Sequence, residues 1–342
     1  MNQQETMVWV SGADEGYVMP LAVTIRSAID HLSPDRRAEI YILDGGITRA
    51  SKDRMERSWQ DDRISVHWVS AEGSDIEGLP VSLHVTSSTY LRLAIAERLP
   101  SSVDRAIYLD ADMLVCRDLS LLWDEPQGDA SVLAVQDYAA PWIDSTRSLS
   151  ASSETLRYLA TSRPIANFEE LGIDEDAMYF NGGLLVIDVK RWREERIFRQ
   201  FLDCLSDHRQ HVLWWDQYAL NVVLAGKWRS LDLRWNQGAH LFSYPGATQS
   251  PFDSDTFQML HQDPWVVHFC SPEKPWNYFC HHPATADFFR TLRDTAWSGY
   301  TPPRPEQYLR RLWGYHYKPV RAHWKFRTRC LKSMVGYRRR AA

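Results

Sequence analysis

Two acidic residues, separated by a single residue, directly follow a short and largely apolar segment. The segment covers residues 105–109, and Asp110, Ala111 and Asp112 come immediately after it. Carboxylate oxygens bind hard divalent cations such as Mg2+ and Mn2+, which keep coordination positions open for diphosphate oxygens. The pair therefore indicates a site at which a cation neutralises charge on a leaving diphosphate. A solvated turn at the end of a strand would show the same two residues.

A histidine and a lysine near residue 270 form a second group that points to the same chemistry. His268 ends an apolar segment, and Lys274 follows it six residues later. Together with the two aspartates, an imidazole would complete a mixed oxygen and nitrogen site, which suits Mn2+ better than Mg2+. Lys274 would then act as a point charge on the diphosphate. A single buried histidine is more often structural, but the nearby lysine favours the functional interpretation.

Two further groups of residues are candidates for contacts with a sugar. Asn181 precedes Gly182, and its amide can both donate to and accept from hydroxyl groups. The glycine allows the backbone to approach a ligand closely. Asp216 and Gln217 begin a predicted helix, in which Asp216 could serve only as an N-cap and Gln217 could point its amide into a pocket. A glycine-rich turn and a capped helix are the structural alternatives.

An alternation of strands and helices must position these groups. The periodicity of apolar residues predicts helices at 21–32, 50–59, 89–99 and 216–225. Short apolar or alternating segments predict strands at 7–10, 39–43, 64–68, 105–109, 131–135, 183–187 and 264–269. This order predicts an α/β fold with a mainly parallel sheet. Such sheets bind ligands at the carboxyl ends of their strands, which is where the candidate residues fall.

We expect one large catalytic domain over residues 1–285 and a helical C-terminal segment over residues 286–342. A long polar segment, 141–178, interrupts the predicted strands of the first domain. Segments of this length inside a domain commonly cover an active site or bind a substrate. We therefore expect this insertion to shape the acceptor side of the site.

The composition is that of a globular protein, with 44% hydrophobic and 24% charged residues among 342. The cysteines are widely spaced and form no CxxC pair, so neither a disulfide framework nor a zinc knuckle is expected. The N-terminus lacks the pattern of a signal peptide, and no apolar run approaches the roughly 18 residues of a spanning helix. These features favour a reducing, cytoplasmic location.

Basic residues are concentrated at the C-terminal end of the chain. Residues 304–342 contain twelve Lys or Arg and one acid, Glu306, and so carry +11 on a chain whose net charge is -5. Aromatic residues are interspersed with them, as in amphipathic segments that lie on anionic membranes. We therefore expect peripheral binding to the inner face of a membrane. A solvated helix packed on the body is the alternative, and the acidic remainder of the chain argues against nucleic acid as a partner.

Six short motifs occur in an order that resembles glycosyltransferase family 8, retaining enzymes related to bacterial lipooligosaccharide galactosyltransferases and to glycogenin. They are Ala-Asp-Glu-Gly-Tyr at 13–17, Ser-Thr-Tyr-Leu-Arg-Leu at 88–93, Tyr-Leu-Asp-Ala-Asp at 108–112, Phe-Asn-Gly-Gly at 180–183, Asp-Gln at 216–217 and the stretch 268–276. The resemblance covers roughly residues 7–278. It implies a single GT-A domain of Rossmann-like fold, a UDP-galactose or UDP-glucose donor, and a glycan, glycolipid or glycoprotein acceptor. It also implies Mn2+ as the cofactor, with Mg2+ as the other candidate.

The resemblance further implies a role for individual motif residues. The implied metal ligands are Asp110, Asp112 and His268. The implied contacts with the nucleotide, its diphosphate or the donor sugar are Asp14, Tyr17, Arg92, Ala111, Asn181, Gly182, Asp216, Gln217, Ser271 and Lys274, with Tyr17 stacking on the uracil base. Two positions depart from the family pattern. Gly16 stands where many relatives have Asn, which removes one expected nucleotide contact, and Ser271 replaces a glycine, which adds a side chain near the diphosphate.

The outcome implied by the resemblance is retention of configuration at the anomeric carbon. The residue expected nearest to that carbon, Gln217, has a neutral amide and is a poor nucleophile, whereas Asp216 is expected to hold sugar hydroxyls. We therefore favour a front-face reaction in which orientation and the charge of Lys274 supply most of the catalysis. Two alternatives stay open: a phosphatase of the haloacid dehalogenase type, whose nucleophile motif resembles residues 109–112, and a catalytically silent scaffold that binds a nucleotide sugar.

Overall fold

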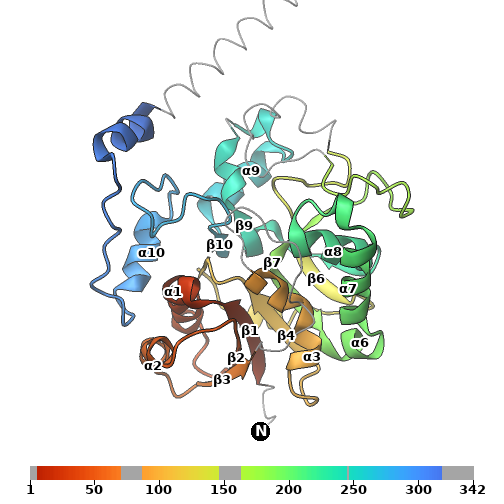
Figure 1. The fold of residues 1–342 in the computed structure, drawn as a ribbon, viewed down its shortest axis with the longest axis horizontal. Helices are drawn as coiled ribbons and strands as arrows, with labels where there is room; N and C mark the ends of the chain where they lie inside the picture. The colour runs from red at the N-terminus through yellow and green to blue at the C-terminus, as the bar shows by residue number, and fades with distance from the viewer. Residues whose placement is uncertain (1–5, 71–86, 146–162, 245, 318–342) are drawn as a thin grey trace, which may run out of the picture.

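The computed structural model describes residues 6–70, 87–145, 163–244 and 246–317. Its centre is a seven-stranded sheet in the order β3-β2-β1-β4-β7-β6-β8 (Figure 1). The strands are β1 (Met7–Ala13), β2 (Ala38–Asp44), β3 (Ile64–Ser70), β4 (Arg105–Leu109), β6 (Val132–Gln136), β7 (Phe180–Asp188) and β8 (Trp228–Ser230). Its strand pairs are parallel except those that β7 makes with β4 and β6. The predicted α/β fold with a mainly parallel sheet is therefore confirmed.

Helices cover both faces of this sheet. They are α1 (Val18–Asp30), α2 (Arg49–Ser58), α3 (Ile95–Arg98), α4 (Ser120–Trp123), α6 (Val189–Glu194), α7 (Ile197–Asp207), α8 (Trp215–Val223), α9 (Ser254–Gln262) and α10 (Thr285–Leu292). Figure 1 shows α1, α2 and α10 on one side of the sheet and α3, α6, α7 and α8 on the other. Because both faces are covered, strand residues such as Met7 to Val10 of β1 are apolar without interruption and are buried.

The direction of β7 brings its first residues to the edge at which the parallel strands end. Leu184 of β7 pairs with Leu109 of β4. One step further along, the backbone N–H of Asp110 donates to the carbonyl of Gly183 over 2.8 Å. The first acidic residue after β4 therefore lies directly beside the glycine pair that begins β7.

A second, smaller sheet carries the histidine to the same place. It contains β5 (Met113–Val115), β10 (Val266–His268) and β9 (Gln237–Gly238), in the order β5-β10-β9. In the antiparallel pairing of β5 with β10, His268 lies opposite Met113. The backbone N–H of Phe269 also donates to the carbonyl of Asp112 over 3.0 Å. A histidine more than 150 residues away in sequence is thereby fixed next to the two aspartates.

The segment predicted as one helix at 89–99 differs in the structure. It forms a 3-10 helix, η2 (Ser87–Ala94), followed by the single α-helical turn α3. Side chains three residues apart eclipse one another in a 3-10 helix, whereas they diverge in an α-helix. Thr89 and Arg92 are three residues apart, and both reach the carboxylate of Asp216. The tighter winding therefore allows both side chains to contact the same carboxylate.

The two ends of the polar insertion at 141–178 lie next to each other. The backbone N–H of Ile143 donates to the carbonyl of Ala177, and that of Tyr179 donates to Pro141. Within the insertion, Phe168 is buried and belongs to the hydrophobic core. Residues 146–162 lie outside the described part of the chain.

The C-terminal part of the described chain begins with residues that pack against the rest of the protein. Helix α10 contacts α1, and Phe288, Leu292 and Trp297 belong to the hydrophobic core. Packing is therefore continuous across residue 285, where the sequence suggests a boundary. Residues 308–317 are helical, and the rest of the basic segment, 318–342, lies outside the described residues. Among the described helices, none is long and apolar enough to cross a membrane.

Candidate active site

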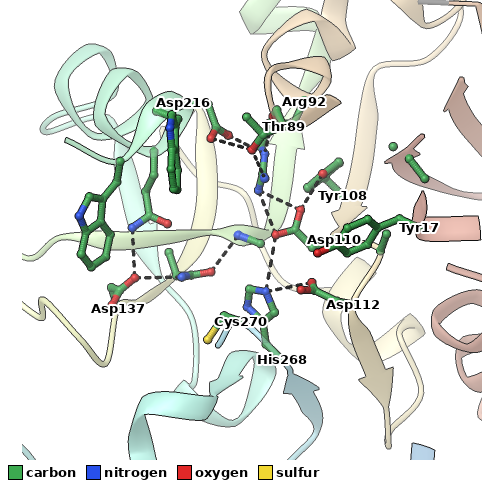
Figure 2. Close-up of a pocket in the computed structure, with 18 of the residues that line it drawn as sticks. Tyr17, Thr89, Arg92, Tyr108, Asp110, Asp112, Asp137, Asp216, His268 and Cys270 are labelled. Carbon is green, nitrogen blue, oxygen red and sulfur yellow. Dashed lines mark hydrogen bonds and ion pairs between the residues drawn. The ribbon is translucent and has the colours of Figure 1, made fainter. Parts of the chain in front are cut away.

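An open cleft of about 1110 Å³ lies at the edge of the main sheet where β1, β4 and β6 end and β7 begins. Ala13 ends β1, Asp110 follows β4, Asp137 follows β6 and Asn181 lies near the start of β7, and all four line the cleft. Figure 2 shows Asp110, Asp137 and His268 among the side chains that line the cleft from separate elements.

Two carboxylates and one imidazole form a compact cluster in this cleft. The ligand atoms of Asp110, Asp112 and His268 lie within 4.8 Å of one another. Nε2 of His268 lies 3.3 Å from Oδ1 of Asp112 and 3.6 Å from Oδ2 of Asp110. The other ring nitrogen, Nδ1, lies 3.0 Å from Oδ1 of Asn236. The imidazole therefore presents Nε2 to the two carboxylates.

The charges of this cluster depend on one another. Burial of the imidazole opposes its protonation, but Cys270, Asp112 and Asp110 around it outweigh burial and raise the pKa of the histidine to about 9. Burial likewise disfavours the ionised form of Asp112, but Lys274 and His268 outweigh this and lower its pKa well below the ordinary value. Without a cation, the cluster thus holds an imidazolium between carboxylates.

Lys274 is buried against the second aspartate. Its Nζ donates to Oδ2 of Asp112 over 2.6 Å and to the carbonyl of Phe269 over 2.6 Å. Burial lowers the pKa of the ammonium, but the charge of Asp112 outweighs burial and raises it. Lys274 therefore stays a fixed positive charge in the wall of the cleft.

A glycine is required where β7 passes the cluster. A β-carbon on Gly183 would lie 2.5 Å from Cε1 of His268 and 2.9 Å from Oδ2 of Asp110, closer than real contacts allow. On Gly182 it would lie 3.0 Å from Cδ1 of Leu220, a tight contact with the end of a side chain. The first glycine of the pair is thus the more tolerant position, and the second is indispensable to the packing of the cluster.

Arg92 joins the cluster to a second buried carboxylate. One of its terminal nitrogens lies 3.0 Å from Oδ1 of Asp110, and its Nε lies 2.6 Å from Oδ2 of Asp216. Asp216 also accepts from the hydroxyl of Thr89 over 3.1 Å. Burial raises the pKa of Asp216 to about 6, since the shared guanidinium lowers it less than burial raises it. Helix α8 has no side-chain N-cap bond, so Asp216 is not a capping residue.

The amides of Gln217 and Asn181 are fixed by a shared carboxylate. Nε2 of Gln217 and Nδ2 of Asn181 donate to Oδ2 of Asp137 over 3.1 and 2.9 Å. The backbone N–H of Gly182 in turn donates to Oε1 of Gln217 over 3.0 Å. Both amides are therefore held by fixed partners.

Aromatic residues line the cleft on two sides. Tyr17 follows β1, and its ring meets Trp276 edge-on at 6.1 Å between centroids. On the other side, Trp214 and Trp215 precede the sugar-contact candidates Asp216 and Gln217. Trp215 has a φ of 47°, a left-handed conformation that is strained for a large side chain. Such strain is typical of residues held in place by a functional site.

The structure brings most of the predicted site residues together. The cleft is lined by Asp14, Tyr17, Arg92, Asp110, Ala111, Asp112, Asn181, Asp216, Gln217, His268 and Lys274. Gly182 lies directly behind them, with its carbonyl accepting from Arg92 over 2.6 Å. Ser271 is not among the lining residues, and its hydroxyl donates to the carbonyl of Glu273. The expected side-chain contact of Ser271 with the diphosphate therefore has no support in this geometry.

Sequence reasoning missed several residues of the site. Asp137 follows β6 just as Asp110 follows β4, so its position after an apolar strand was an available signal. Thr89 and Cys270 lie inside the motifs at 88–93 and 268–276, which was their signal. Asn236 gave no comparable signal, because it reaches the site through a contact with His268, far from it in sequence.

Several known proteins are similar to this chain in sequence or in fold. General stress protein A of Bacillus subtilis (strain 168) is 27% identical over 301 residues, covering 87% of this chain and 97% of that protein. The lipopolysaccharide 1,3-galactosyltransferase of Salmonella typhimurium is 24% identical over 292 residues, covering 84% of this chain and 78% of that one. A crystal structure of the galactosyltransferase LgtC with donor and acceptor sugar analogs has the same fold. It matches with a TM-score of 0.68 and 24% identity, covering 88% of this chain and 99% of that chain.

A family model accounts for the same region of the chain. The model described as glycosyl transferase family 8 matches residues 9–280. This range contains every residue that lines the cleft, from Gly12 to Lys274. The chain therefore belongs to glycosyl transferase family 8.

Proposed function

We propose that this protein transfers a hexose, galactose or glucose, from a UDP-sugar to a hydroxyl of a glycan or glycolipid, with retention of configuration and in dependence on Mn2+. The observation that carries the proposal is the cluster of Asp110, Asp112 and His268, which lies in the same cleft as Lys274 and Gln217. A carboxylate site beside a fixed positive charge suits a diphosphate, and neighbouring amides suit sugar hydroxyls.

The donor set fits a divalent cation of borderline softness. Two carboxylates and one imidazole favour Mn2+, while Mg2+ prefers oxygen ligands alone. Nε2 of His268 faces the carboxylates, and Gly183 leaves the space beside them free of a side chain. When bound, the cation supplies positive charge that stabilises the leaving diphosphate.

Three parts of the cleft would hold three parts of the donor. Asp14 and Tyr17, at the end of β1, would bind the uridine, with the Tyr17 ring stacking on the base. Lys274, which is bonded to Asp112, would contact the diphosphate. Asp216, with Arg92, and the amides of Asn181 and Gln217 would surround the sugar. This order follows the cleft from β1 across β4 to β7 and α8.

The geometry favours a front-face reaction. Both hydrogen-bonding ends of the Gln217 amide have partners, on Asp137 and Gly182, and a neutral amide is a poor nucleophile. The Asp216 carboxylate is paired with Arg92 at 2.6 Å and accepts from Thr89, so it is held away from attack. These residues would orient the sugar and stabilise its positive charge, while the acceptor hydroxyl attacks from the side of the departing phosphate, which takes its proton.

The acceptor is proposed from the relatives and from the insertion at 141–178. Similar proteins include a lipopolysaccharide 1,3-galactosyltransferase and a lipopolysaccharide 1,2-glucosyltransferase of Escherichia coli (strain K12). We infer an acceptor of the lipopolysaccharide or polysaccharide type. The ends of the insertion lie beside β7, next to the sugar side of the cleft, which is where an acceptor must enter.

The basic C-terminal segment would hold the protein at the inner face of an anionic membrane. In the described helix at 308–317, Leu309, Trp313 and Tyr317 are exposed and four residues apart, so they share one face. Arg310 and Arg311 lie between them. Deleting residues from 304 onward is expected to abolish binding to vesicles that contain phosphatidylglycerol. Unchanged vesicle binding would contradict this part of the proposal.

The proposed function is tested by the release of UDP from a panel of UDP-sugars without an acceptor. Slow hydrolysis of one sugar, present with Mn2+ and absent with a chelator, is the expected result and identifies the donor. Calorimetry with UDP and Mn2+ provides a second readout. If no UDP-sugar is hydrolysed and UDP does not bind in the presence of Mn2+, the transferase proposal is contradicted and a nucleotide-independent role must be sought.

A further inference from the structure

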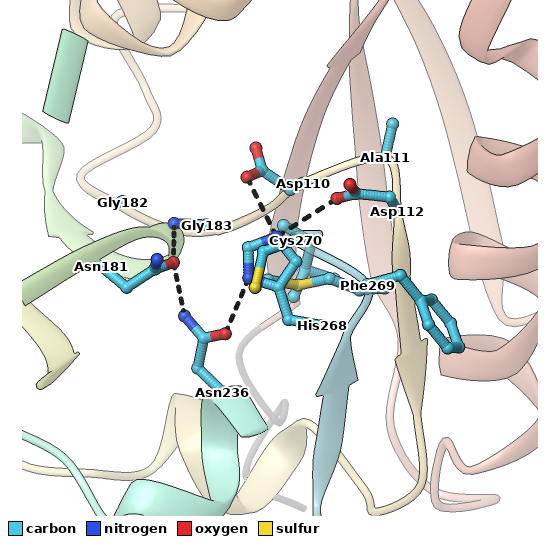
Figure 3. A network of polar contacts seen from close by, with 12 residues as sticks. Asp110, Ala111, Asp112, Asn181, Gly182, Gly183, Asn236, His268, Phe269 and Cys270 are labelled. Carbon is cyan, nitrogen blue, oxygen red and sulfur yellow. Dashed lines mark hydrogen bonds and ion pairs between the residues drawn. The ribbon is translucent and has the colours of Figure 1, made fainter. Parts of the chain in front are cut away.

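A row of side-chain amides connects the imidazole of the cluster to Asp137, a carboxylate on the sugar side of the cleft. Figure 3 shows the row from His268 through Asn236 to Asn181, and Figure 2 labels Asp137. Nδ1 of His268 lies 3.0 Å from Oδ1 of Asn236, and Nδ2 of Asn236 donates to Oδ1 of Asn181 over 3.0 Å. Nδ2 of Asn181 then donates to Oδ2 of Asp137 over 2.9 Å. The four side chains come from four separate segments: the end of β6, the start of β7, the 3-10 helix Leu233–Asn236 and the end of β10.

Asp137, at the end opposite His268, determines which group donates and which accepts in each hydrogen bond of the row. An amide can present either its oxygen or its nitrogen to a partner, whereas an ionised carboxylate only accepts and a backbone N–H only donates. Asp137 receives four donors: the backbone N–H groups of Ala139 and Ala140 on Oδ1, at 2.7 and 3.2 Å, and the amides of Asn181 and Gln217 on Oδ2. It therefore requires the nitrogen of Asn181, not its oxygen.

Each following amide has only one arrangement left. With its nitrogen on Asp137, Asn181 presents Oδ1, which also accepts from the backbone N–H of Gly183 over 2.9 Å. Asn236 must then give its nitrogen to Asn181 and turn its oxygen to His268. An oxygen at that place accepts a hydrogen bond from the N–H of Nδ1. Nε2 is therefore the nitrogen that gives up its proton when a cation binds, and its lone pair then faces the space between Asp110 and Asp112.

We propose that Asp137, acting through Asn181 and Asn236, selects the tautomer of His268 that binds the cation through Nε2. This inference rests on the proposed function, because the tautomer of His268 matters only if a cation binds between Asp110, Asp112 and His268. Asn236 and Asp137 are positioning residues: neither is a ligand. Because Asp137 also holds the Gln217 amide, one carboxylate organises both the sugar side and the metal side of the cleft.

The test is the affinity for Mn2+, not turnover. Free Mn2+ is followed by its electron paramagnetic resonance signal during titration of the full chain with saturating UDP, with a blank of UDP alone. Asn236→Leu, which has a similar shape but no acceptor for Nδ1, is expected to weaken Mn2+ binding about 10- to 100-fold, the usual loss when the partner of a metal-bound histidine is removed. Asn236→Asp keeps an acceptor for Nδ1 and is expected to restore most of the affinity.

The carboxylate is tested in the same titration. In Asp137→Asn, either orientation of the new amide points its nitrogen at two donors, so the row loses its anchor. We expect weaker Mn2+ binding although residue 137 is not a ligand. Asn167→Ala is the matched control, because Asn167 is about equally buried and its side chain accepts from Tyr218, outside the row. It is expected to lower the melting temperature without changing Mn2+ affinity.

The outcomes separate the two proposals. If the unaltered chain binds no Mn2+, the proposed function itself is contradicted. If it binds Mn2+ and Asn236→Leu binds it equally well, the tautomer selection is overturned while the function stands. Equal losses in Asn236→Leu, Asn236→Asp and the Asn167→Ala control would also overturn it, because they would indicate a general loss of structure.

Discussion

Gly183 and His268 lie so close together that a β-carbon on the glycine would be 2.5 Å from Cε1 of the ring. The same β-carbon would lie 2.9 Å from Oδ2 of Asp110, and neither neighbour is the free end of a flexible chain. Gly183→Ala is therefore expected to displace His268 or Asp110 and to weaken Mn2+ binding at least about 10-fold, since ligand geometry decides affinity.

Gly299→Ala is the matched control for this change. A β-carbon at residue 299 would meet nothing within 4 Å, and its backbone needs no special conformation. Both variants are measured for Mn2+ affinity and for the free energy of unfolding. If Gly183→Ala binds Mn2+ as tightly as Gly299→Ala does, the cluster is not the metal site.

Removing the charge of Lys274 should have an effect on stability that depends on the cation. Lys274→Met leaves Asp112 buried with only His268 beside it, and breaking such a pair costs about 3–5 kcal/mol. A bound cation supplies a positive charge next to the same carboxylate. We therefore expect the loss of melting temperature in Lys274→Met to be large in chelator and clearly smaller in saturating Mn2+. The same loss in both buffers would show that the cation does not reach Asp112.

The raised pKa of Asp216 predicts a specific dependence of stability on pH. The pKa is about 6 in the folded protein and 3.8 in the unfolded chain. Since the folded pKa is raised, this group contributes stability below pH 3.8 that is lost as pH rises through 6. From pH 5 to pH 8, the free energy of unfolding of the unaltered protein should therefore fall by about 1.4 kcal/mol more than that of the Asp216→Asn variant.

Denaturant titrations of both proteins at the two pH values measure this difference, because the contributions of other groups cancel. The same carboxylate should be ionised to accept from sugar hydroxyls, so kcat/KM is expected to fall as pH drops below about 6. A stability difference that does not change with pH would indicate that Asp216 ionises with an ordinary pKa.

The front-face reaction predicts that Gln217 contributes by orientation alone. Gln217→Ala removes the bonds to Asp137 and to Gly182, so the sugar loses one wall of its site. We expect kcat to fall about 100-fold without vanishing, which is the size of effect that misplacement produces. Mass spectrometry of this variant with donor should show no sugar on the protein. A hexose trapped on Asp216 would instead establish a double displacement.

Much of the fold follows from local patterns. All seven predicted strands and the helices α1, α2 and α8 coincide with observed elements to within a few residues. Their residues alternate or repeat with the period of the structure they form, so the signal is present in each segment by itself. The two aspartates after β4 were identifiable for the same reason, because the end of a parallel strand is where ligands bind.

Other features required contacts between distant residues. The 3-10 winding of η2 accompanies the approach of Thr89 and Arg92 to Asp216, more than 120 residues further on, and no local periodicity reports such a contact. The direction of the Ser271 hydroxyl, which donates to the carbonyl of Glu273, is likewise not given by the position of this residue in its motif. Side-chain direction of this kind depends on which neighbours pack around the residue.

The α/β class, the position of the acidic pair after an apolar strand and the order of the family motifs can all be recognised in the sequence alone. The sequence alone does not show that His268 lies opposite Met113 through the pairing of β10 with β5. Nor does it show that Asn236 contacts His268 and is connected to Asp137 through Asn181. The physical reason is that strand and helix periodicity are local properties of the chain. The direction of a hydrogen bond, and hence the tautomer of a histidine, is a property of a network closed by residues from several elements.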